Sequence, residues 1–267
     1  MTDKPFLTSP VVPPDVYDDT YYLGMCGGHE EWTASGGVTG APVYPCTLEQ
    51  AGFQPGTILL DIGTGRGEML AAAVDKGARL AVGVEYAAAA VALTQQTLRA
   101  RGVTDRAHVL LADARRLPLP DASVDMVTML DVIEHLTPPE LDAALGEAWR
   151  VLRPGGLLVG HTFPTRTIYD VTYRLLRLAL PRWRRGWPVD PRLDYERLMH
   201  VNEQTVRGLR RSVVRAGFPD ADVRLGEMVY TEFLPSISAR ALYRRLARHR
   251  MTRPLAVADM WVHARRP

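Results

Sequence analysis

A short apolar run followed by three alternating glycines constrains the fold of this chain most. It is the stretch Thr57–Leu70, with the sequence TILLDIGTGRGEML. Its apolar part, residues 58–62 around Asp61, suits a strand buried on both faces. Gly63, Gly65 and Gly67 follow, directly before a helix-forming segment, Glu68–Lys76. Glycines at a strand-to-helix turn let the backbone bend sharply and let a ligand approach closely, so the stretch predicts a ligand-binding βα turn.

The spacing of these glycines separates two kinds of nucleotide site. The stretch reads D-x-G-x-G-x-G, whereas the dinucleotide fingerprint is G-x-G-x-x-G. Glu68 stands where that fingerprint would place its third glycine. An NAD site is therefore disfavoured, and a generic strand-to-helix turn without a ligand is the alternative.

The segments that follow alternate between strand and helix. Apolar runs predict strands at Arg79–Glu85, Ala107–Asp113, Ser123–Val132 and Leu157–Phe163, and helices are predicted at Ala87–Arg101 and Pro138–Leu152. This alternation implies right-handed βαβ crossovers and a parallel sheet. Ligands of such sheets bind at the carboxyl ends of the strands. The residues predicted to lie at those ends are the glycine turn, Glu85, Asp113 and Asp131.

The remainder of the chain divides into segments around this core. We predict an N-terminal arm and cap segment over residues 1–46, a core over 47–164, a lid insertion over 165–200 and a C-terminal part over 201–267. The C-terminal part is expected to add two strands and two helices. They are Glu203–Gly217 and Ser238–Arg250 as helices, and Val223–Tyr230 and Ala256–Ala264 as strands.

Composition excludes several classes of protein. With 46% hydrophobic and 23% charged residues the chain is typical of a globular protein. It lacks an apolar run of about 18 residues and an N-terminal signal core, which predicts a cytoplasmic protein. Cys26 and Cys46 are too few for a disulfide framework, and no metal-ligand spacing is evident, so no metal is expected.

Four motifs occur in the order in which a known family carries them: LLDIGTGRG, VGVE, LLADARRLPLPDASVDMV and LDVIEHL. Together they resemble the class I S-adenosylmethionine (SAM) dependent methyltransferases, over roughly Ala51–Phe163. The DVIEHL segment is similar to that of the small-molecule enzymes of the ubiquinone and menaquinone type. Methyltransferases of nucleic-acid amino groups usually carry N/D-P-P-Y/F there, which this chain lacks. The resemblance implies a small-molecule substrate and no nucleic acid.

The same resemblance implies an α/β fold and a set of cofactor contacts. The fold is a Rossmann-like, seven-stranded, mostly parallel sheet of order 3-2-1-4-5-7-6, with its last strand antiparallel, helices on both faces and a helical lid. Asp61 would bind the amino group of SAM, Glu85 the ribose hydroxyls and Asp113 the adenine amino group. The other implied cofactor residues are Gly63, Thr64, Gly65, Gly67, Tyr86, Ala114 and Leu130.

Candidates on the acceptor side are less specific. His135 is the first candidate for a general base, and a structural role at the start of a helix is its alternative. His29 and Tyr22 are secondary candidates, and His161 is expected to be a core residue. The aromatic-rich stretch Asp15–Ser35 can either roof a ligand or pack on the core.

Two further predicted helices, one in the lid insertion and one in the C-terminal part, leave the substrate and partners open. Ile168–Leu180 is apolar around most of its circumference, so it can cover a pocket, form a dimer face or lie on a membrane surface. In Ser238–Arg250, Leu242 and Tyr243 are expected on the buried side and the arginines on the solvent side. The acceptor atom can be O, N or C. Alternatives are a membrane-surface methyltransferase for a lipid-like acceptor and a protein that uses SAM as a structural or electrostatic aid. The oligomeric state is not predicted.

Overall fold

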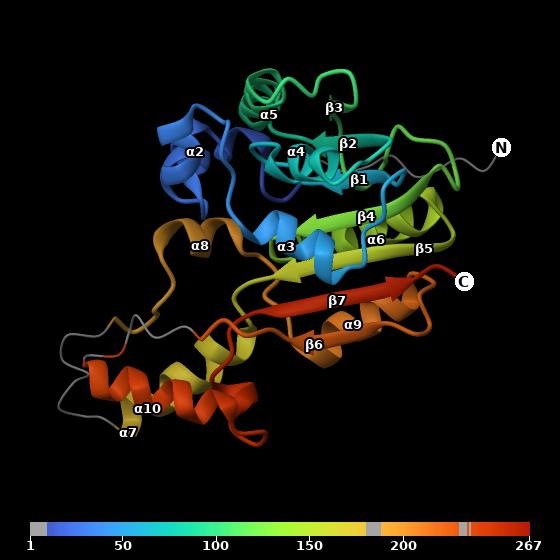
Figure 1. Ribbon diagram of the computed structural model, residues 1–267. Helices are drawn as coiled ribbons and strands as arrows, with labels where there is room; N and C mark the ends of the chain where they lie inside the picture. The colour runs from blue at the N-terminus through green and yellow to red at the C-terminus, as the bar shows by residue number, and fades with distance from the viewer. Residues whose placement is uncertain (1–9, 180–187, 230–233, 235) are drawn as a thin grey trace.

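The computed structural model describes residues 10–179, 188–229, 234 and 236–267, and its centre is one seven-stranded sheet (Figure 1). The strand order is β3-β2-β1-β4-β5-β7-β6. Strands β1 to β5 pair in parallel, and β7 runs antiparallel to both β5 and β6. The predicted order and the antiparallel last strand are confirmed. The strands are β1 Ile58–Ile62, β2 Leu80–Glu85, β3 Ala107–Leu111, β4 Val124–Leu130, β5 Leu152–Thr162, β6 Asp222–Leu225 and β7 Met260–Arg265.

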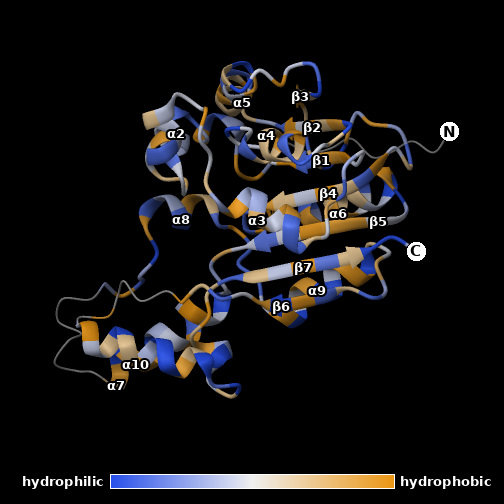
Figure 2. Ribbon diagram, viewed as in Figure 1, coloured by the Kyte–Doolittle hydropathy of each residue, from blue (hydrophilic) through white to orange (hydrophobic). Residues whose placement is uncertain are grey.

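Helices cover both faces of this sheet, and each face has its own apolar core. Helices α6 and α9 cover one face, where Leu141 and Leu209 pack against β1, β4 and β5. Helices α3 and α4 cover the other, through Leu48 and Leu70. Figure 2 shows the apolar character of the strands between them. The helices of the described residues are α1 Asp19–Gly24, α2 His29–Ser35, α3 Val43–Gln50, α4 Glu68–Asp75, α5 Ala88–Ala100, α6 Pro138–Val151, α7 Arg174–Ala179, α8 Asp194–Met199, α9 Val206–Arg215 and α10 Ile237–Arg248.

Some element boundaries differ from the prediction. Strand β5 begins at Leu152 and not at the predicted Leu157, because Leu152 already pairs with Val124; residues 153–156 form an irregularity before Leu157 pairs with Met126. Strand β6 ends at Leu225, well before the predicted end at Tyr230, which lies outside the described residues. The apolar pattern predicted too short a β5 and too long a β6, because pairing with the neighbouring strand decides where a strand begins and ends.

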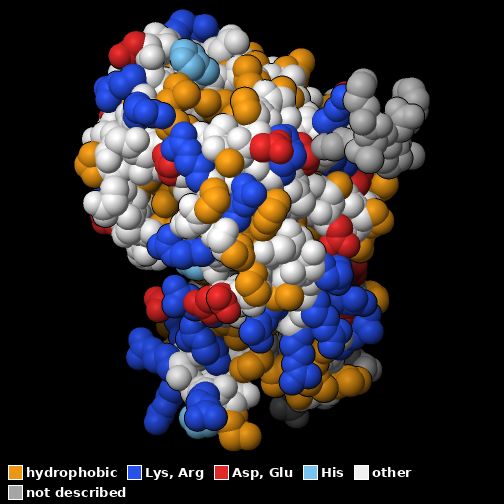
Figure 3. Space-filling view, turned by 90° about the vertical axis from the view of Figure 1, so that its right-hand side faces the viewer, with side chains coloured by type: hydrophobic (Ala, Val, Ile, Leu, Met, Phe, Trp, Pro, Cys, Tyr) orange, Lys and Arg blue, Asp and Glu red, His pale blue; other side chains and the backbone are white. Residues whose placement is uncertain are grey.

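The predicted helix Ile168–Leu180 is a π-helical turn, Ile168–Tyr173, followed by α7. Ile168, Tyr169 and Tyr173 are buried, whereas Leu178 is 73% exposed. Residues 180–187 lie outside the described residues. In Figure 3 basic side chains gather among hydrophobic ones at the level of α7, α9 and α10. None of the helices in the described ranges is both long and apolar enough to cross a bilayer.

Helix α10 was predicted to bury both Leu242 and Tyr243. The structure buries Tyr243 and Ala247 and leaves Leu242 60% and Leu246 41% exposed. The prediction for Leu242 was wrong because the helix packs through a narrower stripe than its full apolar face. Leu176 of α7 packs against the same cluster as Tyr243, so α7 and α10 lie beside each other.

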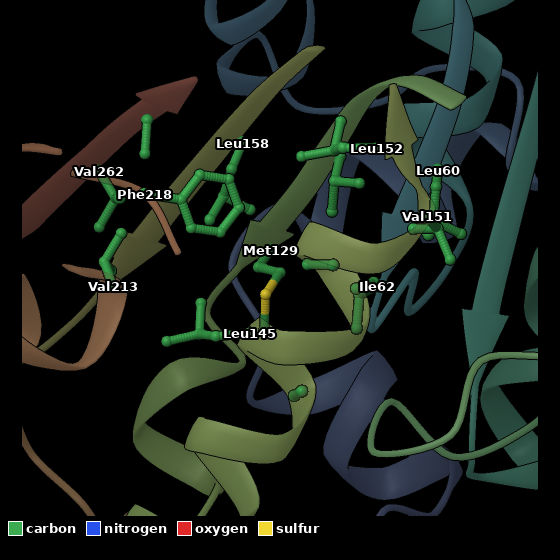
Figure 4. Close-up of a cluster of buried hydrophobic side chains, with 14 of the residues drawn as sticks. Leu60, Ile62, Met129, Leu145, Val151, Leu152, Leu158, Val213, Phe218 and Val262 are labelled. Atoms are coloured by element: carbon green, nitrogen blue, oxygen red, sulfur yellow. The ribbon is translucent and has the colours of Figure 1, made fainter. Parts of the chain in front are cut away.

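The core between the sheet and helices α6 and α9 shows how the second half of the chain is joined to the first. Phe218, which follows α9, is completely buried among Val213, Leu145 and Leu158 (Figure 4). Val262 of β7 belongs to the same cluster. One aromatic ring therefore contributes to the packing of α9 and the antiparallel edge on the parallel part of the sheet.

We expect Phe218→Ala to lower the free energy of unfolding by about 3–5 kcal/mol, because it leaves a cavity in a fully buried site. Denaturant unfolding followed by circular dichroism measures this change. The control is Ile237→Ala, at a side chain that is 87% exposed, which should change stability by no more than about 0.5 kcal/mol. A loss for Phe218→Ala equal to that of the control would contradict this account of the core.

Candidate functional site

A cavity of about 1090 Å³ lies at the carboxyl ends of the parallel strands. Side chains from β1, β2, β4 and β5 reach it, and residues of α1 and α8 line its opposite side. Asp61, Glu85, Asp113 and Asp131, predicted to share one rim, all line this cavity. So do Gly63, Thr64, Gly65, Tyr86, Ala114 and Leu130. Gly67 does not line it and instead begins α4.

The glycine turn has a conformation that other residues would strain. Gly63 has φ +72°, and a Cβ atom there would lie 2.3 Å from a methyl group of Val132. Gly67 has φ +81° and is packed against Thr94. The turn therefore lies close to the end of β4 on one side and to α5 on the other, with the backbone of Gly63, Thr64 and Gly65 facing the cavity.

Asp61 is a buried carboxylate at the base of this turn. It is 4% exposed, and its Oδ1 accepts a hydrogen bond of 2.6 Å from the hydroxyl of Thr128. Burial raises the pKa of Asp61 to about 7, although the hydrogen bond from Thr128 acts in the opposite direction. A cationic group beside Asp61 would stabilise its ionised form, so the site suits an ammonium group.

Glu85, at the end of β2, joins the glycine turn to the next strand. Its carboxylate accepts hydrogen bonds from the backbone amides of Gly65 (3.2 Å), Tyr86 (2.9 Å) and Ala87 (3.2 Å). Burial raises the pKa of Glu85, and the three amides oppose that shift. The side chain is thus fixed in one orientation at the cavity wall.

Asp113 is held by an arginine two residues further along the chain. Arg115 donates to both carboxylate oxygens of Asp113, at 2.7–3.0 Å, and also to Oε1 of Glu140 at 3.2 Å. The same Glu140 oxygen accepts the backbone amide of Val11. Because Glu140 lies in the first turn of α6, this network connects the end of β3, the start of α6 and the N-terminal segment.

Two charged residues within the glycine motif hold the N-terminal segment over the cavity. Arg66 is 4% exposed and donates to the backbone carbonyls of Tyr22 (2.8 Å) and Gly27 (2.6 Å). It also pairs with Glu68 at 2.7 Å, and Glu68 accepts the backbone amide of Ala41. This role was not predicted from the sequence. The available signal was the presence of an arginine and a glutamate at a turn that is expected to be buried, where charged side chains are rare.

Both interpretations of the aromatic N-terminal segment apply. Tyr17, Tyr21 and Tyr22 line the cavity and pack in a cluster with Ala87 and Leu93 of the core. Trp32 faces the core and donates a hydrogen bond to Thr97. The segment therefore roofs the cavity and packs on the core at once.

His135 lines the cavity in the short 3₁₀ turn that follows β4. The hydroxyl of Tyr17 lies 2.8 Å from its Nδ1, and the ring of His200 packs edge-on at 4.9 Å. Burial, reinforced by His200, lowers the pKa of His135 to about 3, so its imidazole is neutral at neutral pH. Tyr22 also lines the cavity. His29, the first residue of α2, does not.

His161 differs from the expectation of a core histidine, because it lines the cavity. Its Nδ1 lies 2.6 Å from Oδ1 of Asp131, and its Nε2 lies 3.4 Å from Oδ2 of Asp259. Burial acts to lower the pKa of His161, but the two carboxylates outweigh it and raise the pKa to about 10. Asp259, which lies 98 residues away, was not predicted as a partner of His161, because only the pairing of β5 with β7 brings the two together.

Glu134, His135 and His200 offer ligand atoms within 4.8 Å of one another, a spacing that can hold a metal ion. Glu134 accepts a hydrogen bond from Thr162 and His135 contacts Tyr17. Hydrogen bonding therefore accounts for two of the three side chains without a metal.

Comparisons with known proteins agree with this geometry. A family model described as "Methyltransferase domain" matches residues 60–160. A ubiquinone/menaquinone biosynthesis C-methyltransferase of Shewanella oneidensis is 31% identical over 189 residues, covering 66% of this chain and 72% of that protein. The corresponding protein of Shewanella woodyi is 28% identical over 187 residues, with the same coverage.

Solved structures share the fold. A phosphoethanolamine N-methyltransferase of Haemonchus contortus, in complex with SAM, matches 95% of this chain and 60% of its own, with a TM-score of 0.67 and 17% identity. The [4+2]-cyclase SpnF matches 84% of this chain and 80% of its own, with a TM-score of 0.58 and 20% identity. Given the relatives, the fold and the cavity, the chain belongs to the class I SAM-dependent methyltransferases.

Proposed function

We propose that this methyltransferase transfers the methyl group of SAM to a small, largely apolar acceptor at O, N or C. The observation that supports this best is a single cavity that joins the glycine turn and three strand-end carboxylates to a wall of aromatic and histidine side chains. Its volume of about 1090 Å³ lies at the upper end of the usual range for ligand pockets, which leaves room for a nucleoside and an acceptor together.

The residues present fit the cofactor. The buried carboxylate of Asp61 suits the amino group of a methionine moiety, and the glycine turn beside it admits a close backbone contact. We assign Glu85 to the ribose hydroxyls, and Asp113 with Ala114 to the adenine. Tyr86 and Leu130 would line the same part of the cavity.

SAM supplies an electrophilic methyl group on a positively charged sulfur and becomes neutral S-adenosylhomocysteine. The protein then has to align the acceptor and accept its proton. Alignment can contribute a large part of the rate enhancement. His135 is our candidate for the proton acceptor, since its imidazole is neutral and faces the cavity beside Tyr17.

The names of the relatives bear on the acceptor. The Shewanella proteins are C-methyltransferases of ubiquinone and menaquinone biosynthesis, which favours a ring-shaped, apolar acceptor methylated at carbon. The cavity wall carries matching apolar side chains, among them Met25, Val132, Phe163 and Trp261. Methylation at nitrogen is the alternative, because the structural neighbour from Haemonchus contortus is an N-methyltransferase.

The resemblance to a [4+2]-cyclase favours a second candidate, in which SAM stays intact and assists another reaction. Mass spectrometry of the product separates the two, because only transfer adds the mass of one methyl group. A gain of one methyl on a reduced naphthoquinone, with both hydroxyl groups still free in the product, would support C-methylation.

A membrane-surface enzyme is the other candidate. Leu178 is 73%, Ile237 87% and Leu242 60% exposed on α7 and α10, and α10 also carries Arg240 and Arg244. Apolar side chains among arginines suit the surface of an anionic bilayer, where a lipid-like acceptor would be dissolved.

We expect SAM to stabilise the protein and NAD and ATP to have no such effect. At a free concentration of 100 times Kd, a ligand of the folded state adds about 2.7 kcal/mol to the free energy of unfolding.

Glu85→Gln should weaken binding of S-adenosylhomocysteine roughly 10-fold or more, because a charge-assisted hydrogen bond is lost. Calorimetry measures the affinity, with Asp105→Asn at an exposed surface pair as control. Equal affinities for both variants would contradict the assignment of Glu85.

We expect His135→Gln to lower kcat by about 10²–10⁴-fold and to leave the affinity for S-adenosylhomocysteine unchanged. Because the pKa of His135 lies near 3, its base form persists well below pH 6.5, and His135 should cause no loss of rate near that pH. Tyr17→Phe should have a smaller effect. If His135→Gln keeps kcat within about threefold, the histidine has the structural role instead.

For the membrane-surface candidate, we expect the protein to co-sediment with vesicles rich in anionic lipid and to be released by salt, which screens surface charges. Vesicles of neutral lipid should bind less. Ile237→Ser with Leu242→Ser should reduce sedimentation without affecting the affinity for S-adenosylhomocysteine. No binding to anionic vesicles at low salt would exclude this candidate.

A further inference from the structure

We propose that Asp131, held by His161 and Asp259, anchors the acceptor through an O–H or N–H group, and that the acceptor is therefore a hydroxyl- or amino-bearing ring. This inference rests on the proposed function and assigns the substrate class of the same cavity. The hydrogen-bonded network of Asp131, His161 and Asp259 has no role in the proposed binding of the cofactor or in the proposed proton transfer to His135.

Asp131 stands where the cofactor part of the cavity meets the rest. It directly follows β4, and its neighbour Val132 is packed against Gly63 of the glycine turn. Its own partner, His161, lies near the end of β5. A group bound at Asp131 would therefore lie between the glycine turn and the part of the cavity lined by β5 and β7.

The backbone of Asp131 is held in an uncommon conformation. Its φ is +54°, and its amide donates to the carbonyl of His161 at 3.1 Å. Left-handed conformations are uncommon outside glycine, although aspartate and asparagine tolerate them best. Such outliers are found at functional sites when the surrounding structure holds them, and here His161 does so from both its backbone and its ring.

One oxygen of Asp131 is engaged and the other is available. Oδ1 lies 2.6 Å from Nδ1 of His161. Within the described residues, the side chain of Asp131 makes no other hydrogen bond. The side chain is nevertheless 60% exposed and lines the cavity. Oδ2 is thus a hydrogen-bond acceptor with a fixed position and room for a ligand.

His161 is fixed in turn by Asp259, which is 4% exposed. Asp259 also accepts the backbone amide of Met228 at 2.8 Å and the indole N–H of Trp261 at 3.1 Å. Gly226 leaves the space for this carboxylate, because a Cβ atom there would lie 1.8 Å from Oδ2 of Asp259. Asp259 and His161 are therefore positioning residues for Asp131.

The charges of the network select a hydrogen-bond donor. Two carboxylates enclose one imidazolium, which leaves a net negative charge at the anchor. A carboxylate oxygen accepts a hydrogen bond and repels an anion. The ring of Trp261 lies 4.5 Å from that of His161 and lines the cavity, which adds a flat apolar wall. A neutral ring with a hydroxyl or amino group matches both features.

The test uses phenol, anisole and benzoate as probes of the full-length protein saturated with S-adenosylhomocysteine, with binding measured by NMR titration. We expect phenol to bind at least about 10-fold more tightly than anisole, which lacks the donor hydrogen, and than benzoate, which is an anion. In the variant Asp131→Asn an NH2 group, which donates hydrogen bonds, replaces one acceptor oxygen. Asparagine also tolerates the left-handed backbone conformation of this position. This variant should lose the preference for phenol over anisole.

His161→Gln and Asp259→Asn should each weaken the preference partly, and Asp105→Asn should leave it unchanged. Equal binding of phenol and anisole to the wild-type protein, or an unchanged preference in Asp131→Asn, would overturn the inference. Failure to bind S-adenosylhomocysteine in the first place would refute the proposed function. A protein that binds it and treats the probes alike refutes only the anchor.

Discussion

The carboxylate of Glu85 makes the contacts on which the site depends. It accepts the amide of Gly65 from one βα turn and the amides of Tyr86 and Ala87 from the next. This carboxylate therefore links the loop that follows β1 to the loop that follows β2 and fixes their separation. Burying a carboxylate costs free energy unless several donors compensate it, and three backbone amides do so here. The glycine turn keeps its shape because this group is satisfied.

The cavity divides into two parts with different electrostatics. On the side of β1, β2 and β3, carboxylates face a space suited to an amino group and a nucleoside. On the side of β5 and β7, histidines and aromatic rings dominate, and two of the histidines that line the cavity differ in charge: His135 is neutral and His161 is protonated. His161 is buried and His135 is half-buried; the difference in charge arises because two carboxylates contact His161, whereas Tyr17 and His200 contact His135.

The sheet order could be predicted because the motifs resemble those of a known family. The shared rim of acids could be predicted from the alternation of strands and helices, since parallel topology brings the carboxyl ends of the strands together whatever their exact bounds. The sequence could not reveal the pairing of His161 with Asp259, which depends on the register between β5 and β7 across 98 residues. It also misjudged Leu242, because the width of the buried stripe on α10 depends on what packs against it. The assignments of Glu85, Asp113 and His135 to the cofactor and acceptor remain predictions.

The pair Arg66–Glu68 has a thermodynamic consequence. Arg66 lies between two residues of the glycine turn, yet three of its contacts are to Tyr22, Gly27 and Glu68, and Glu68 also accepts the backbone amide of Ala41. A ligand that orders the turn must then also order the roof, and anything that displaces the roof must loosen the turn. Since such linkage is reciprocal, binding of a ligand at the glycine turn and closure of the N-terminal segment over the cavity are coupled.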